Sequence, residues 1–184
     1  AESSVSREHS IRIDANGLIT IAGGKLTTYR RMAKEVVGKA VGLLKKQGHS
    51  LTTNNRDTGT IPLIGAQDWP TGDNAKAQLV NHMVEQGQQR ISVQTAQLLV
   101  DTYGVRGMEV VELVLNDSSL GNRLLPNSDR SEILAQVVFS VESELAQSIN
   151  DVMIRRTQLF FKDQNQGLDC IESVADMMGT LLEW

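Results

Sequence analysis

Two short segments near the start of the chain carry the pattern of β-strands. In residues 10–14 polar and apolar residues alternate, which is the period of a half-buried strand. Residues 18–22 are apolar and rich in β-branched side chains, and Asn16-Gly17 stands between the two segments. An Asn-Gly pair is the strongest signal for a two-residue hairpin turn. The pattern therefore predicts an antiparallel hairpin, which needs a partner surface because two strands alone are only marginally stable.

Helical spacing begins directly after Gly23-Gly24. Between residues 26 and 43, apolar side chains recur at intervals of three and four, and Gly48 is a suitable stop. Residues 25–46 carry seven Lys and Arg side chains against one acidic side chain, Glu35. The sequence thus predicts a basic amphipathic helix. Its polar face is expected to be solvated, while binding of that face to anionic lipid remains the alternative.

A second, longer helical region follows a connecting segment. Residues 49–70 are rich in Thr, Asn, Gly and Pro and show no long periodicity, which is typical of a linker. Ser148 and Asp151 resemble a helix capping box. The fold class is therefore predicted as mainly α, with helices expected at residues 73–87, 92–103, 105–116, 129–145, 148–162 and 167–182.

Composition narrows the range of functions. The chain has 184 residues, of which 40% are hydrophobic and 22% charged, as in globular proteins. A net charge of −4 argues against a general nucleic-acid binder, and no apolar run reaches the roughly 20 residues of a membrane span. The single cysteine, Cys170, excludes an internal disulfide, and no metal-ligand spacing is present. Because Ala1 stands in place of Met, we expect a processed chain or a part of a longer one.

The corner between the second predicted strand and the basic helix carries candidate chemistry. Glycines allow a close approach of backbone to a ligand, and a helix begins with unpaired N–H groups and a positive dipole end. Lys25 adds a full charge, and Thr27 and Thr28 add hydroxyl groups. Such a corner suits a phosphate, a carboxylate or an electron-rich cofactor edge. A plain turn with a solvated lysine is the alternative. A P-loop is excluded because Ile19 and Leu26 occupy positions that need Gly and Ser or Thr.

Several motifs together resemble one enzyme family. They are Ser6-Arg7-Glu8-His9 and the long run from Gly17 through Gly23-Gly24-Lys25-Leu26-Thr27-Thr28-Tyr29-Arg30 to Met32-Ala33. Residues 62–66, 103–106, 151–157 and 174–178, with the closing Trp184, extend the similarity over nearly the whole chain. These motifs resemble the FAD-dependent glycerol-3-phosphate dehydrogenases, including the respiratory enzymes and the α-glycerophosphate oxidases.

The resemblance implies a division of the chain. Residues 1–48 would be the hairpin and helix at the end of an FAD-binding α/β domain, residues 49–70 a linker, and residues 71–184 a helical C-terminal domain. The apolar face of the basic helix would then be buried in the FAD domain. The G-x-G-x-x-G motif that opens such enzymes is absent from the chain. The isolated chain is therefore expected to be inactive and to hold no FAD.

The resemblance also implies site residues and a reaction. Arg7 and Lys25 would bind the substrate phosphate, and the flavin ring would lie against Gly23, Gly24, Lys25, Leu26 and Thr27. In the complete enzyme a hydride would pass from C2 of glycerol-3-phosphate to flavin N5, which gives dihydroxyacetone phosphate. Electrons would then reach a quinone or oxygen. The catalytic base is expected outside this chain, and the complete enzyme is expected in the cytoplasm, peripherally attached to the membrane.

Other interpretations stay open beside this one. The chain could be a helical protein-interaction module without cofactor, or a membrane-surface adaptor that uses the basic helix. His9 could be a site residue or a surface histidine, whereas His49 and His82 are expected to be solvated. Cys170 is expected in the core, and Arg155 and Arg156 are expected to hold neighbouring helices through carboxylates. An orphan hairpin has unpaired edges, so residues 10–22 are expected to mediate self-association.

Overall fold

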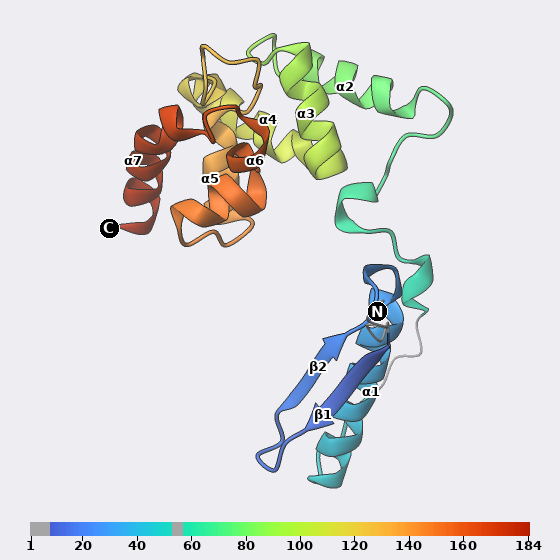
Figure 1. Ribbon diagram of the computed structural model, residues 1–184. Helices are drawn as coiled ribbons and strands as arrows, with labels where there is room; N and C mark the ends of the chain where they lie inside the picture. Colours follow the sequence, from blue (N-terminus) through green and yellow to red (C-terminus); the bar gives the residue numbers. More distant parts are fainter. Residues whose placement is uncertain (1–7, 53–56) are drawn as a thin grey trace, which may run out of the picture. The chain divides into compact units, whose positions relative to one another are not determined.

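The chain folds into two compact units. A computed structural model describes residues 8–52 and 57–184. Residues 1–57 form the N-terminal unit and residues 58–184 the C-terminal unit, each drawn in Figure 1. The division falls inside the segment 49–70 that the sequence indicates as a linker. Within the described ranges the only strands are the two of the N-terminal unit, so the mainly α fold class is confirmed.

The N-terminal unit begins with the expected antiparallel hairpin. Strand β1 (His9–Ile13) pairs with β2 (Ile19–Gly23), with Ile11 opposite Ile21. The prediction of a two-residue turn is wrong. The Asp14 N–H donates to the Leu18 carbonyl at 2.9 Å, so three residues form the loop, and Gly17 alone takes a positive φ of 87°. This is a type I turn closed by a left-handed glycine, the usual form of a three-residue hairpin loop.

The basic segment forms a helix that packs along the hairpin. A 3₁₀ turn, η1 (Leu26–Thr28), leads into α1 (Tyr29–Lys46). The side of α1 that carries Met32, Val36, Ala40 and Leu43 is half-buried, whereas Leu26 is 88% exposed and Val37 is also exposed. None of the described residues of this unit is fully buried. Within the unit, the predicted apolar face of α1 is therefore only partly covered.

The C-terminal unit is helical throughout. It contains the α-helices α2 (Ala75–Gln86), α3 (Val93–Tyr103), α4 (Gly107–Asn116), α5 (Leu134–Glu142), α6 (Leu159–Lys162) and α7 (Ile171–Leu182). Short 3₁₀ segments connect them: η2 (Thr58–Thr60), η3 (Ile64–Ala66), η4 (Gly104–Arg106), η5 (Ser118–Gly121) and η7 (Leu168–Cys170), and η6 (Asp151–Arg156) is a π-helix. Four of the six helices predicted beyond the linker match closely, and those at 129–145 and 148–162 need correction.

Residues 129–133 are irregular rather than helical because Arg123 holds this segment by its backbone. The Arg123 Nε donates to the Arg130 carbonyl at 2.8 Å, and its Nη2 donates to the Ser128 carbonyl. Arg123 also forms an isolated antiparallel bridge with Ile133. The helix therefore begins only at Leu134, where this bridge ends.

The predicted helix at 148–162 is divided in two. It starts as expected, since the Ser148 N–H donates to Asp151 Oδ2 at 3.0 Å and the Asp151 N–H donates to Ser148 Oγ at 3.3 Å. These reciprocal bonds confirm the capping box, here at the start of the π-helix η6. Gln158 then takes a left-handed conformation with φ of 60°, which ends the segment, and α6 follows as a single turn.

Helix α5 lies at the centre of the C-terminal unit. Its residues 135–141 are all buried, and it packs against α4 on one side and α7 on the other. Its buried polar groups are bonded: Gln136 Oε1 accepts from the Ile133 N–H at 3.1 Å, and Gln136 Nε2 donates to the Tyr103 hydroxyl at 3.2 Å. Burial raises the pKa of Tyr103 to about 12, so this hydroxyl stays neutral. One core cluster lies between α5 and helices α2–α4, and a second between α5, η6 and α7.

The structure shows the roles of Cys170, Arg155 and Arg156. Cys170 is fully buried, its Sγ donates to the Gly167 carbonyl, and burial raises its thiol pKa to about 11, which confirms a core residue. Arg156 Nη2 donates to the Glu144 carbonyl at 2.7 Å, and Arg156 Nε lies 3.3 Å from the Glu144 carboxylate. Arg156 thus ties η6 to the turn after α5, as expected. Arg155 instead pairs with Asp151 inside η6, at 2.9 Å.

Two of the motifs noted in the sequence meet in the C-terminal unit. Gly65, of the Pro-Leu-Ile-Gly-Ala segment, lies against Gly104, which follows Tyr103. A Cβ at Gly104 would stand 2.0 Å from the Gly65 carbonyl oxygen, and Gly104 has a φ of 63°. The contact joins the segment that enters the unit to the corner between α3 and α4, and it leaves no space for a side chain.

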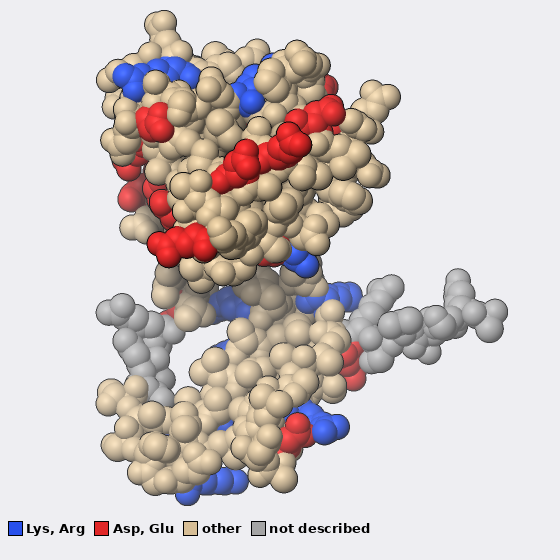
Figure 2. All heavy atoms as spheres, turned by 90° about the vertical axis from the view of Figure 1, so that its left-hand side faces the viewer, with Lys and Arg blue, Asp and Glu red and all other residues tan. Residues whose placement is uncertain are grey.

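The two units differ in charge. The N-terminal unit has ten basic and five acidic residues, a net charge of +5, whereas the C-terminal unit has eight basic and seventeen acidic residues, a net charge of −9. Figure 2 shows acidic side chains gathered on one face of the C-terminal unit. In the described ranges no helix has the length and hydropathy needed to cross a membrane.

Alanine at Gly104 should destabilise the C-terminal unit more than alanine at a glycine in open space. Gly72 also has a positive φ, of 100°, but a Cβ there meets nothing within 4 Å. Backbone strain alone costs Gly72→Ala about 1–2 kcal/mol, and overpacking against Gly65 adds about 1–3 kcal/mol in Gly104→Ala. Urea denaturation followed by tryptophan fluorescence measures this, because Trp69 and Trp184 both lie in the C-terminal unit. Equal losses of unfolding free energy in the two variants would show that the close approach of Gly65 and Gly104 does not add to the cost of a side chain.

Candidate cofactor-binding turn

The turn after β2 is built from two glycines with left-handed backbones. Gly23 has φ of 82° and Gly24 φ of 86°. A Cβ at Gly23 would lie 2.8 Å from the Glu8 carbonyl oxygen, and one at Gly24 would lie 2.7 Å from Met32 Sδ. The fold itself therefore requires both glycines, whether or not a ligand approaches the turn.

The helix start follows this turn at once. Lys25 is extended, and its carbonyl accepts from the Thr28 N–H at 3.0 Å and from Thr28 Oγ1 at 2.8 Å. The expectation that Thr28 offers its hydroxyl to a ligand is corrected, because this hydroxyl already donates within the turn. The first N–H groups of a helix have no acceptor inside it and carry the positive end of the dipole. Such a helix start favours an electron-rich group.

The charged side chains around the turn leave Lys25 available. Arg30 pairs with Asp57, and Arg31 Nε donates to Glu35 Oε1 at 2.9 Å. Lys25 is exposed and pairs with no acidic side chain in the described part of the chain. Its ammonium group therefore adds an uncompensated positive charge beside the first N–H groups of the helix.

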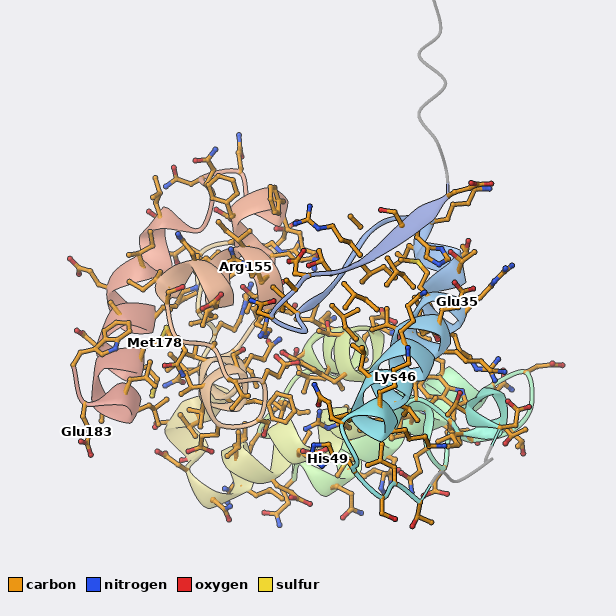
Figure 3. The ribbon with its side chains drawn as sticks, turned by 90° about the horizontal axis from the view of Figure 1, so that it is seen from below. Glu35, Lys46, His49, Arg155, Met178 and Glu183 are labelled. Atoms are coloured by element: carbon orange, nitrogen blue, oxygen red, sulfur yellow. The ribbon has the colours of Figure 1, made fainter. Side chains whose placement is uncertain are left out.

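His9 connects the strand to the helix instead of standing free. It lies opposite Gly23 in the hairpin, and its Nε2 is 2.7 Å from Glu35 Oε2. Hydrogen bonds from Arg31 and His9 hold the pKa of the Glu35 carboxyl below its ordinary value. Figure 3 labels Glu35 in the first half of α1 and Lys46 and His49 near its other end. The pair fixes β1 against α1 next to the turn, so His9 positions the site from behind.

The predicted site residues fall into two groups. Gly23, Gly24, Lys25, Leu26 and Thr27 are consecutive and all exposed, whereas Arg7 lies outside the described residues. Reasoning from the sequence missed the positioning roles of Met32, under Gly24, and Glu35, bonded to His9. Glu35 carries a signal that was available, since it is the one acid in a basic helix. His49 and His82 are exposed, as expected.

The turn places an apolar side chain next to positive charge. The exposed side chain of Leu26 offers an apolar contact for a ring, while Lys25 and the helix N-terminus offer positive charge for an electron-rich carbonyl edge. Within residues 8–52 and 57–184 no cluster of three or more His, Cys, Asp or Glu side chains could hold a metal ion.

Comparison with known proteins places the chain in a family. Residues 56–184 match the family described as the C-terminal domain of alpha-glycerophosphate oxidase. The chain belongs to this family. The C-terminal unit is thus an alpha-glycerophosphate oxidase C-terminal domain, and the family resemblance of the sequence is confirmed.

Relatives extend the similarity to the N-terminal unit. A glycerol-3-phosphate dehydrogenase of Synechocystis is 31% identical over 98% of this chain and 31% of its own length. The mitochondrial glycerol-3-phosphate dehydrogenase of Rattus norvegicus is 33% identical over 98% of the chain and 23% of its own length. A probable mitochondrial enzyme of Dictyostelium discoideum is 31% identical over 99% of the chain and 26% of its own length. The chain therefore spans between about a quarter and a third of the length of these relatives.

Alanine at Gly24 should release the hairpin from α1, whereas alanine at Gly38 should not. Gly24→Ala places a methyl group against Met32 Sδ at a positive φ. Gly38 lies in α1 with nothing within 4 Å of its Cβ, so Gly38→Ala is expected to stabilise the helix by about 1 kcal/mol. Amide hydrogen exchange of residues 9–23 reports the difference. Unchanged protection in the Gly24→Ala variant would show that the turn tolerates a side chain.

Proposed function

We propose that this chain is the C-terminal part of an FAD-dependent glycerol-3-phosphate dehydrogenase that oxidises glycerol-3-phosphate to dihydroxyacetone phosphate. The observation that carries the proposal is the exposed Gly23–Thr27 turn, in which two left-handed glycines are followed at once by Lys25 and an exposed Leu26 at the start of a helix. The family of the C-terminal unit and the similarity to glycerol-3-phosphate dehydrogenases support it. In this proposal, residues 1–48 complete an FAD-binding domain, residues 49–70 form a linker, and residues 71–184 form the helical C-terminal domain.

The residues of this chain have electrostatic and binding roles in the proposal. FAD, when bound, supplies the hydride acceptor. Lys25 and the first N–H groups of the helix stabilise the negative charge that develops at the carbonyl edge of the ring. Leu26 and the glycine backbone contact the ring, and Arg7 and Lys25 bind the substrate phosphate, for which a guanidinium fork has matching geometry. His9 and Glu35 hold the turn in position.

The proposal includes the surroundings of the complete enzyme. Electrons leave to a quinone or to oxygen, and the complete enzyme is cytoplasmic and attached peripherally to the membrane. The isolated chain presents one wall of the flavin site and is inactive.

The role of Lys25 is tested in a polypeptide in which the dinucleotide-binding domain precedes this chain. Lys25→Met should lower turnover of glycerol-3-phosphate about 100-fold, the effect of removing one group that stabilises developing negative charge. Lys25→Arg keeps the charge and should recover part of the rate. Lys39→Met removes a similar exposed charge from α1, far along the helix, and should leave the rate unchanged. Full turnover by the Lys25→Met variant would show that Lys25 does not stabilise the transition state.

Flavin content tests the division of the enzyme separately. Visible absorbance of the purified chain and titration with FAD should show no stoichiometric binding, because only one wall of the site is present. Tight binding at one FAD per chain would mean that this chain builds a whole flavin site. That outcome would overturn the proposal that this chain is only part of the enzyme. The proposed chemistry of the turn would then be tested by measuring turnover of glycerol-3-phosphate by the chain itself.

We further propose that two copies of the isolated chain associate through residues 10–22. Both outer edges of the hairpin lack a strand in the described part of the chain, and Leu18 beside it is 59% exposed. Size-exclusion chromatography with light scattering should therefore give a dimer or larger species. Leu18→Lys should yield a monomer, whereas Val37→Lys, at an equally exposed 59% position on α1, should not. A monomeric parent chain at high concentration would contradict this association.

A further inference from the structure

A groove of about 420 Å³ lies in the C-terminal unit, in a part of the chain that the proposed function does not use. Its walls come from residues 67–70, from α2, and from the corner between η4 and α4. The volume is within the range of sites that hold small molecules, which is roughly 300–1,000 Å³. We name this feature the Asp68 groove.

The apolar residues that line the Asp68 groove are held in place by the core. They are Pro70, Leu79, Val105 and Met108; Leu79 belongs to the main core cluster, and Val105 and Met108 pack against that cluster. Val105 directly follows Gly104, whose backbone lies against Gly65. That contact fixes the segment before α2 against the η4 corner, so two walls of the groove are positioned by the fold itself. A ligand finds these walls already formed and has little ordering cost to meet.

The polar residues that line the groove are exposed and include one carboxylate. They are Asp68, Gln67, Gln78 and His82, and we refer to them as the rim. Among the described residues that line the groove, none is Lys or Arg, and no ion pair of Asp68 is found within the described ranges. The surrounding unit has a net charge of −9. The potential at the rim therefore attracts cations and repels anions.

The geometry points to a binding site for a small molecule with a short apolar body and an ammonium group. We propose that the apolar body lies on Pro70, Leu79, Val105 and Met108. The ammonium group then faces the Asp68 carboxylate, and the amide oxygens of Gln67 and Gln78 supply further acceptors. This site is independent of the flavin turn, since all of its residues lie in the C-terminal unit.

Three probes that share one apolar body test the proposal on the full chain. They are 2-phenylethylammonium, neutral 2-phenylethanol and anionic phenylacetate. The reporter is the fluorescence of Trp69, which stands in the sequence between the groove residues Asp68 and Pro70. In a Trp69→Phe variant only Trp184 remains, so loss of the fluorescence change there assigns the signal to Trp69. We expect saturable binding of the cation with a Kd of about 1 mM, weaker binding of the alcohol and none of the anion. Absence of saturation by the cation, or equal affinity for phenylacetate, would overturn the proposal.

A matched pair of variants assigns the charge. Asp68 has φ of 57°, a conformation that Asn also adopts readily, so Asp68→Asn should fold normally. It should weaken binding of 2-phenylethylammonium about fivefold, the upper range for an exposed ion pair, and the loss should shrink at high salt. Asp73→Asn removes an exposed charge outside the groove and should leave the affinity unchanged. Identical affinities for the parent chain and the Asp68→Asn variant would show that the carboxylate does not hold the ligand.

Discussion

The C-terminal unit depends on burial of one helix from all sides. Every residue of α5 from Ala135 to Val141 is buried, and both core clusters contain side chains of this helix. A helix of this kind has no polar face, so its few polar groups need partners inside the protein. Gln136 meets this need through the Tyr103 hydroxyl and the Ile133 N–H, and Ser140 through the Gln136 carbonyl. These bonds fix how α5 is oriented, and the surrounding helices pack onto the surface that it presents.

The N-terminal unit follows a different principle. Its hairpin and helix cover each other on one side only, and none of its described residues is fully buried. Local geometry gives it order: the left-handed Gly23 and Gly24, the contact with Met32, and the His9–Glu35 bond all fix the same turn. The order of this unit therefore comes from local geometry and a few specific contacts rather than from a buried core.

Glycine has two separate uses in this chain. At Gly23 and Gly24 a positive φ and close packing together shape a turn that presents Lys25 and the helix start. At Gly65 and Gly104 the absence of side chains lets two distant backbone segments touch, and the Asp68 groove owes its walls to that contact. In the first case the residue serves a local conformation, and in the second it serves a tertiary contact. Only the structure therefore shows which of these two uses a glycine in the sequence has.

The sequence by itself determined those features that rest on local periodicity and local chemistry. Alternation and Asn16-Gly17 predict the hairpin, helical spacing predicts α1 and most later helices, and Ser148 with Asp151 predicts a helix start. The run from Gly23 to Thr27 identifies the candidate turn, and Arg7 lies outside the described residues, so its placement stays a prediction. The three-residue loop was decided by the conformation of the folded hairpin, in which Gly17 alone takes a positive φ.

Only the tertiary structure decided the features that join residues far apart in the chain. Arg123 donates to the Ser128 and Arg130 carbonyls and forms a bridge with Ile133, so residues 129–133 are not helical despite their helical pattern. His9 bonds to Glu35, which is 26 positions away in the sequence, and Gly65 contacts Gly104, although α2 and α3 lie between them in the chain. Periodicity reports which face of a segment is apolar, whereas such pairings depend on where the packed core brings two segments together. The consecutive residues of the candidate turn could therefore be identified from the sequence, whereas the side chains that hold this turn from behind could not.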